Sequence, residues 1–119
     1  KALGAEVSIM TPSKHDEIVA LVSHLPHLVA SGLVSVIDEK YWKFAASGLR
    51  DTTRVASGDP DLWLGICKQN KARIIKALKC FSKEVKSTLN DLEKGNDNKI
   101  LKRLKKSKAV RDKKKWKKG

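Results

Sequence analysis

The sequence predicts an all-α protein of about five helices. Apolar residues recur at steps of three and four along several segments, Pro and Gly stand where such segments begin and end, and no two alternating segments indicate a pair of strands. No internal repeat is found. The 119 residues suffice for one domain with a modest core, and a composition of 40% apolar and 33% charged residues is ordinary for a soluble chain.

The first and longest apolar helix is expected from Thr11 to about Ile37. Thr11 is a suitable N-cap, and Pro12 suits the first helical position, where its missing N–H costs nothing. Pro26 lies inside this helix. Because its ring cannot donate to the carbonyl of Val22, at a cost of roughly 3 kcal/mol in a helix interior, we expect a bend there and a free backbone acceptor.

Two stripes of side chains run along this helix at helical spacing. One is apolar and consists of Ile18, Val22, Leu25 and Val29. The other is narrow and mostly polar, and consists of Asp16, Ala20, Ser23 and His27. Since the apolar neighbours favour burial of most of the circumference, the polar side chains of the second stripe must find partners or line a wet pocket.

Shorter helices are expected next. Ser47 can cap a helix of about residues 48–56, which Ser57 and Gly58 can end. Asp59 and Pro60 then begin a helix to about Lys68. This helix is expected to bury three side chains: Leu62, Trp63 and Ile66.

The remaining chain predicts two more helices. Asn70 can cap a long helix over residues 71–94, whose apolar stripe suits a core or a helical partner, and Gly95 ends it. Asn96 can cap a last helix. Its apolar side is expected to include Ile100, Leu101, Leu104 and Val110.

The positive charge is concentrated in the last segment. The formal net charge is +13, and residues 97–119 contain 12 Lys or Arg and 2 Asp. Such a tail could bind nucleic acid or an acidic surface, yet it contains one aromatic residue, Trp116, and no nucleic-acid motif. A solvated basic helix is therefore favoured, and residues 96–119 are assigned as a basic extension of a domain spanning residues 1–95.

Other classes of site and location receive little support. Cys67 and Cys80 lack metal-ligand spacing, which favours reduced thiols in a cytoplasmic protein, and no carboxylate completes a metal site with His24 and His27. The apolar runs are interrupted and short for a membrane span, and no secretory signal is found. The chain begins at Lys1 rather than Met, so we expect a fragment whose upstream residues are missing.

Two arginines of the short middle segment share a helical face. Arg50 and Arg54 are four residues apart, and Asp51 flanks them. Neighbouring guanidinium groups repel unless a negative group lies between them. Nearby aspartates could supply that group, and so could an anionic ligand held by bidentate hydrogen bonds. Spacing alone favours the structural pairing.

Two sequence blocks resemble a known family. HDEIVALVSHLPH (residues 15–27) and GLRDTTRVASGDPDLW (residues 48–63) are similar to the C-terminal helical domain of prephenate dehydrogenases, which include arogenate dehydrogenases. The resemblance extends from Leu3 to about Leu92. It implies an intertwined dimer and an oxidative decarboxylation in tyrosine biosynthesis. In that reaction prephenate or arogenate transfers hydride to NAD or NADP and loses carbon dioxide, giving 4-hydroxyphenylpyruvate or tyrosine.

The resemblance also implies an incomplete active site. Family members build it between an N-terminal Rossmann domain and this helical domain, but the chain has no GxGxxG loop after a strand and lacks the N-terminal catalytic histidine. We therefore expect NAD or NADP to be bound mainly by the absent domain, and the fragment to be inactive alone. The sequence does not distinguish NAD from NADP or prephenate from arogenate.

The family motif assigns candidate site residues one by one. His27 matches a histidine of the substrate pocket, and Arg54 matches the arginine that binds the substrate carboxylate, in some members across the dimer interface. Asp51 and Trp63 are candidate supports that position Arg54 and close the pocket. Ser23 could hydrogen-bond in the pocket or only to the helix backbone.

Other assignments remain open. His15 and His24 have weaker claims than His27, and without the resemblance any one of the three histidines would be read as a structural residue. Two alternative functions remain beside the dehydrogenase. One is a basic helical module that binds nucleic acid, and the other is a purely structural dimerisation module.

Overall fold

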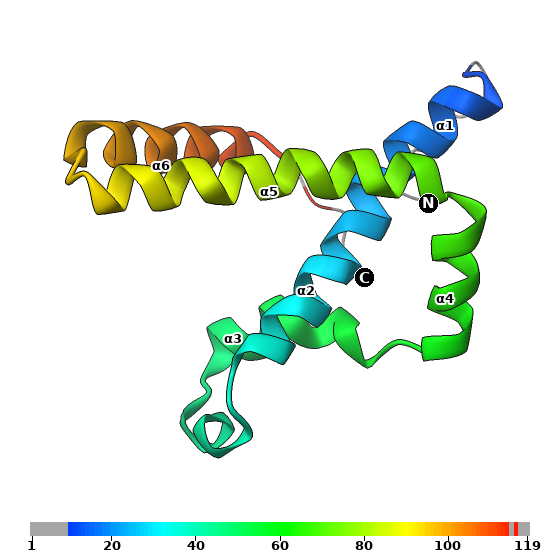
Figure 1. Cartoon of the computed structure of the whole chain (residues 1–119), viewed down its shortest axis with the longest axis horizontal. Helices are drawn as coiled ribbons and strands as arrows, with labels where there is room; N and C mark the ends of the chain where they lie inside the picture. The colour runs from blue at the N-terminus through cyan, green and yellow to red at the C-terminus, as the bar shows by residue number, and fades with distance from the viewer. Residues whose placement is uncertain (1–9, 115, 117–119) are drawn as a thin grey trace. The chain divides into compact units, whose positions relative to one another are not determined.

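The computed structural model describes residues 10–114 and 116, which form helices and contain no strand (Figure 1). The all-α prediction is confirmed. The chain divides into two compact units, residues 1–79 and 80–119, with the division inside its longest helix. Residues 1–9 lie outside the description, so the expected extended entry segment there stays a prediction.

The first helix consists of α1 (Pro12–Val19), the π turn η2 (Ala20–His24) and α2 (Leu25–Val36). Its predicted beginning is confirmed, because the Thr11 hydroxyl accepts a hydrogen bond of 3.1 Å from the Lys14 N–H and Pro12 occupies the first helical position. The helix ends at Val36. The following 3-10 helix η3 (Glu39–Phe44) is capped by Asp38.

The helix departs from α geometry one turn before Pro26. The Leu25 N–H donates to the Ala20 carbonyl, five residues earlier, so the turn before the proline is widened. A wider turn holds an additional residue, and therefore steps of three and four no longer keep side chains on one face across it. Ser23, within this turn, is exposed while Ala20 and His27 are buried. Asp16, before the turn, is exposed as well, so the predicted buried polar stripe is wrong at Asp16 and Ser23.

Burial of this helix is limited to one side. Ala20, His27 and Ala30 are buried, whereas Leu21 and Val22 are exposed, so the prediction of burial around most of the circumference is wrong for the single chain. The cause is that the other elements of this unit cover one face only. The expectation that the apolar runs are short for a membrane span also needs correction. Residues 12–36 form one helix containing an 18-residue window with a mean hydropathy of 1.6, which by length and composition alone is enough to cross a bilayer, a test that core helices of soluble proteins also pass.

The middle segment forms α3 (Ser47–Thr53) followed by the 3-10 turn η4 (Arg54–Ser57). The predicted cap is wrong, because Ala46 occupies the N-cap position without a side-chain hydrogen bond and Ser47 is already helical. The predicted end at Gly58 is confirmed. Its φ of −63° is open to any residue, so chain reversal does not require glycine there.

Helix α4 (Pro60–Gln69) begins as predicted. The Asp59 carboxylate accepts a hydrogen bond of 3.1 Å from the Asp61 N–H, and Pro60 is at the first helical position. The predicted burial is wrong for Leu62, which is 59% exposed, whereas Trp63 and Ile66 are half-buried and no residue of α4 is fully buried. The helix contacts the rest of its unit through one edge, which contains Trp63.

Helix α5 (Lys71–Glu93) ends at Gly95, as predicted, with a φ of +65°. The Gly95 N–H donates to Leu92 and the Asn96 N–H donates to Asp91, which is the pattern of a Schellman motif. Helix α6 (Asp97–Asp112) follows with Asn96 at its N-cap position. The Asn96 side chain does not cap α6, because it donates to the Asp91 carboxylate at 3.3 Å.

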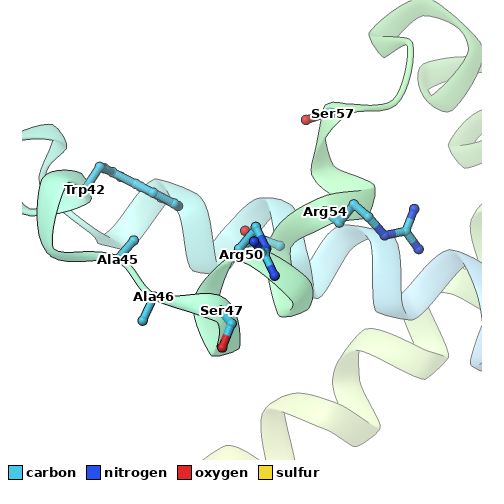
Figure 2. A pocket seen from close by; sticks show the side chains of 8 residues that line it. Trp42, Ala45, Ala46, Ser47, Arg50, Arg54 and Ser57 are labelled. Carbon is cyan, nitrogen blue, oxygen red and sulfur yellow. The ribbon is translucent and has the colours of Figure 1, made fainter.

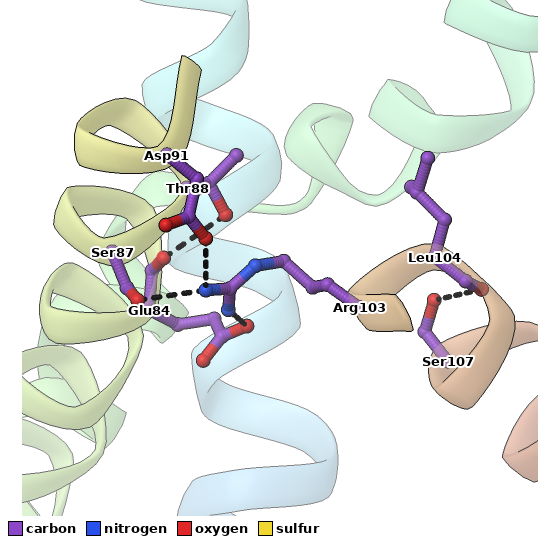
Figure 3. A network of polar contacts seen from close by, with 7 residues as sticks. All are labelled: Glu84, Ser87, Thr88, Asp91, Arg103, Leu104 and Ser107. Atoms are coloured by element: carbon purple, nitrogen blue, oxygen red, sulfur yellow. Dashed lines mark hydrogen bonds and ion pairs between the residues drawn. The ribbon is translucent and has the colours of Figure 1, made fainter. Parts of the chain in front are cut away.

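One arginine joins α6 to the second half of α5. Arg103 donates to the Ser87 hydroxyl at 2.7 Å and to the Asp91 carboxylate at 3.1 Å, and it also pairs with Glu84 (Figure 3). Because these partners occupy successive turns of α5, the guanidinium holds the two antiparallel helices side by side.

The single chain has a small core and a large exposed apolar surface. Among the described residues the buried apolar side chains are Ala20, Ala30, Ile74 and Ala77, and no large side chain is fully buried. The described part of unit 2 exposes eight large apolar residues: Phe81, Val85, Leu89 and Leu92 of α5, Leu101, Leu104 and Val110 of α6, and Trp116. A surface of this kind indicates an interaction with another protein chain or a ligand.

Candidate functional site

Two of the predicted site residues are in direct contact. His27 comes from α2 and is only 8% exposed, and its imidazole lies flat against the indole of Trp63 from α4. The ring centroids are 3.6 Å apart and the ring planes differ by 9°. Stacking of this kind fixes the plane of the imidazole and leaves its nitrogen atoms at the edge of the pair.

Gly58 lies directly against this pair. A Cβ atom at position 58 would be 2.9 Å from Trp63 Nε1 and 3.1 Å from His27 Cε1. Glycine is therefore needed for the close approach of the two rings. Sequence reasoning identified Gly58 only as a helix terminator, and the ordinary φ of this residue shows that its missing side chain is what matters.

A second histidine contacts Trp63 from another direction. His24, the last residue of η2, meets the indole edge to face, with centroids 5.9 Å apart and an angle of 85°. Burial lowers the pKa of His24 below its ordinary value, and the nearby charge of Asp16 partly opposes this effect. The neutral imidazole is thus favoured at this position.

Asn70 joins the same cluster and was not identified as a site residue. It was expected to cap α5, but its side-chain Nδ2 lies 2.9 Å from the Asp16 carbonyl oxygen and 3.4 Å from His24 Nδ1. These contacts bridge 54 and 46 residues of sequence. In the sequence Asn70 is recognisable only as a polar residue between two apolar helices, and this position does not indicate which distant residues its side chain contacts.

Arg54 lies in a different hollow (Figure 2). The hollow has a volume of about 620 Å³ and is lined by Trp42, Ala45, Ala46, Ser47, Arg50, Thr53, Arg54 and Ser57. The lining thus includes two arginines and no carboxylate, and the guanidinium group of Arg54 points away from that of Arg50 (Figure 2). This lining does not include His27 or Trp63, although Ser57 of the hollow directly precedes Gly58, which lies against the stacked pair.

The predicted supporting residues are placed differently from one another. Asp51 accepts a hydrogen bond of 3.3 Å from Arg50 Nε, so its observed ion pair is with Arg50 and not with Arg54. Both side chains of this pair are exposed. Ser23 is exposed as well, and it is not among the residues that line the hollow.

Residues 10–114 contain no group of side chains arranged to bind a metal ion and no strand that could begin a nucleotide-binding fold. No three His, Cys, Asp or Glu side chains of this part of the chain are grouped to hold a metal ion. Cys67 and Cys80 are free thiols. No strand is present among the described residues, so a strand and glycine loop that could bind a dinucleotide are not formed there.

The family of the chain follows from its match to known proteins. Residues 11–106 match the family described as prephenate dehydrogenase, dimerization domain. The chain belongs to this family. The match confirms the resemblance of the two sequence blocks and extends beyond residue 95, so the prephenate dehydrogenase dimerization domain includes the first part of α6.

Individual relatives agree with this assignment. The cyclohexadienyl dehydrogenase of Zymomonas mobilis is 30% identical over 116 residues, covering 92% of this chain and 40% of the relative. The prephenate dehydrogenase of Bacillus subtilis is 31% identical over 118 residues, covering 94% of this chain and 32% of the relative. The chain therefore spans about a third to two fifths of the length of these enzymes.

Solved structures show the same fold. The arogenate dehydrogenase of Synechocystis superposes with a TM-score of 0.81 at 28% identity, covering 87% of this chain and 40% of that structure. The prephenate dehydrogenase of A. aeolicus, solved with hydroxyphenyl propionate and NAD⁺, also gives 0.81 at 31% identity, with 87% and 38% covered. Sequence and structure thus both support the assignment of this chain to the prephenate dehydrogenase dimerization domain family.

Proposed function

We propose that this chain is the substrate-contacting and dimerising part of a cytoplasmic prephenate or arogenate dehydrogenase. The complete enzyme would oxidise and decarboxylate prephenate to 4-hydroxyphenylpyruvate, or arogenate to tyrosine, with NAD or NADP as the hydride acceptor. The observation that carries the proposal is the family match over residues 11–106, which contains both blocks of candidate site residues. The stacked pair and the arginine hollow supply groups suited to such substrates.

His27 and Trp63 are proposed to form one wall of the substrate site. Their stacked rings present a flat surface suited to a six-membered ring, and the imidazole edge can exchange hydrogen bonds with a polar substituent. Because His27 is held between α2 and Trp63, with Gly58 against the pair, its orientation is set before substrate binds. A preset orientation lowers the entropy lost on binding.

Arg54 is proposed to bind a substrate carboxylate. The guanidinium group offers parallel N–H donors that match the two oxygens of a carboxylate, and a lysine could not reproduce that geometry. No acidic residue lines the hollow beside Arg54, but Asp51 pairs with Arg50, so the guanidinium of Arg54 is the group proposed to attract an incoming anion. Prephenate is a dianion and fits this charge.

The residues of this chain do not fit a dinucleotide. The described part has no strand and glycine loop, and the space beside Gly58 is already filled by Trp63 and His27. NAD or NADP is therefore proposed to bind mainly to a Rossmann domain outside this chain. The part of the reaction assigned here is binding and orienting the substrate, and the chain alone is expected to be inactive.

The exposed apolar residues support a homodimer. Helices α5 and α6 of unit 2 expose apolar side chains that a second copy of the chain could cover, as the family description implies. Light scattering at micromolar concentration tests this point. A monomer would contradict the homodimer and would equally contradict the alternative of a purely structural dimerisation module. Binding of nucleic acid by the basic segment stays a prediction of the alternative reading.

The substrate role is tested with Arg54→Ala in the complete dehydrogenase. Losing a charged hydrogen-bonded pair costs about 2–5 kcal/mol, and because Arg54 is exposed in this chain we expect the lower end, roughly a thirty-fold rise in KM. The assay is reduction of the nicotinamide with prephenate or arogenate. Arg111→Ala is the matched control, since Arg111 lies on α6 outside the matched region. An unchanged KM for Arg54→Ala would remove Arg54 from the site.

A further inference from the structure

Asn70 is a buried polar residue whose side chain reaches back to the first helix. It lies between α4 and α5 and is only 8% exposed. Its Oδ1 atom is buried and has no hydrogen-bond partner among the described residues, whereas Nδ2 has two close acceptors. An amide that leaves its own oxygen unsatisfied contributes mainly through its donor side.

The partner at Asp16 fixes the orientation of this amide. A backbone carbonyl oxygen accepts hydrogen bonds only, so the group 2.9 Å from the Asp16 oxygen must be the NH₂ of Asn70. The second hydrogen of that NH₂ is then directed to His24 Nδ1, at 3.4 Å. His24 Nδ1 must therefore accept, which places the imidazole proton on Nε2.

The same amide spans the two ends of the π turn. The Asp16 carbonyl also accepts from the Ala20 N–H, where η2 begins, and His24 is the residue at which η2 ends. Asn70 thus holds the widened turn and one ring of the aromatic cluster together. The ring of His24 contacts Trp63 edge to face, and Trp63 stacks on His27.

We propose that Asn70 is a positioning residue of the substrate site, because its amide fixes His24 in the Nε2–H tautomer and thereby holds Trp63 against His27. The substrate-site part rests on the proposed function. The tautomer and the ring geometry do not depend on it. A protonated His24 would direct an N–H at the Asn70 NH₂, so the clamp requires the neutral imidazole, in agreement with the effect of burial on this group.

The tautomer is measured by NMR of the chain labelled with ¹⁵N-histidine at neutral pH, with His24→Gln used to assign the signals. The wild-type chain should show His24 as the Nε2–H form. In the isosteric Asn70→Asp a carboxylate replaces the donor, and the proton should move to Nδ1. Asn98→Asp on the exposed face of α6 is the matched control and should change nothing at His24. A wild-type Nδ1–H form, which needs no variant to detect, would overturn the proposal.

The position of Trp63 gives a second, independent measurement. In a Trp42→Phe, Trp116→Phe background Trp63 is the remaining indole, and Asn70→Asp should shift its emission to the red and raise its quenching by acrylamide. Asn70→Gln keeps the amide and should restore part of the wild-type emission. Emission and quenching that do not respond to Asn70→Asp would contradict the link from Asn70 to Trp63.

Activity of the complete dehydrogenase separates this proposal from the proposed function. Asn70→Asp should raise KM several-fold and leave kcat within a factor of about two, because the residue orients groups that bind substrate. An altered tautomer together with an unchanged KM would overturn the role of Asn70 in the substrate site. A wild-type enzyme inactive with prephenate and arogenate would refute the proposed function, while the NMR and fluorescence results would still decide the clamp.

Discussion

Replacing Gly58 by alanine tests the close approach of His27 and Trp63. The new Cβ would lie 2.9 Å from Trp63 Nε1 and 3.1 Å from His27 Cε1, and neither atom is the end of a flexible side chain. Overpacking of this kind lowers the free energy of unfolding by about 1–3 kcal/mol. Replacing a glycine at a compatible φ raises it by about 0.4–1 kcal/mol, because alanine reduces the conformational entropy of the unfolded chain. The net expectation is a loss of roughly 1–2 kcal/mol.

The assay is equilibrium unfolding in urea followed by circular dichroism. With a slope of about 1–3 kcal/mol/M, Gly58→Ala should lower the midpoint by roughly 0.3–2 M. Gly65→Ala is the matched control, because Gly65 lies inside α4 with no atom within 4 Å of its Cβ position, so alanine should raise stability by about 0.5–1 kcal/mol. Equal midpoints for the two variants would refute the reasoning.

A double-mutant cycle makes this test more specific. In a Trp63→Ala background the indole that meets the new Cβ is gone, so Gly58→Ala should cost much less than in the wild-type chain. A cost that stays the same in both backgrounds would mean that the backbone at position 58, rather than the ring contact, requires glycine.

Two predictions concern pH. Burial lowers the pKa of His24 below its ordinary value of 6.5. As the pH drops below 6.5 the unfolded chain therefore takes up a proton at His24 before the folded chain does, and the free energy of unfolding should fall. Measured across pH 5–8, the free energy of unfolding of His24→Gln should depend less steeply on pH than that of the wild-type chain. Hydrogen bonds from Arg103 and Asn96 lower the pKa of Asp91 below its ordinary value of 3.8. The contribution of Asp91 to the free energy of unfolding is therefore present above pH 3.8 and is lost as the pH falls through the lowered pKa. Asp91→Asn should lose this pH-dependent contribution in acid unfolding, and a variant that retains it would contradict the assignment.

Local signals in the sequence were read correctly where one or two residues decide the conformation. Thr11 with Pro12 and Asp59 with Pro60 begin helices, and Gly95 ends one, because capping and a positive φ depend on neighbouring atoms only. Ser47 shows the limit of such signals. Its hydroxyl suits a cap, but the helix begins one residue earlier than this signal predicts, so Ala46 occupies the N-cap position and Ser47 is already helical.

Burial was predicted less well, because a periodic apolar pattern does not say what covers it. Leu62 and Val22 follow helical spacing, yet both are exposed in the single chain. The same ambiguity affects the stripe of α5, which suits a core and a partner equally. A pattern read from one chain therefore cannot separate an internal contact from an interface.

The sequence by itself determined the helical class, most helix ends, the family and the candidate pair His27 and Arg54, since these depend on local chemistry and on residue identity in two short blocks. Only the tertiary structure decided which of these residues meet. The widened turn before Pro26 removes Ser23 from the expected face, Gly58 allows Trp63 to stack on His27, and Asn70 reaches Asp16 and His24 across about fifty residues. Such contacts depend on where distant helices pack, and helical periodicity contains no information about that.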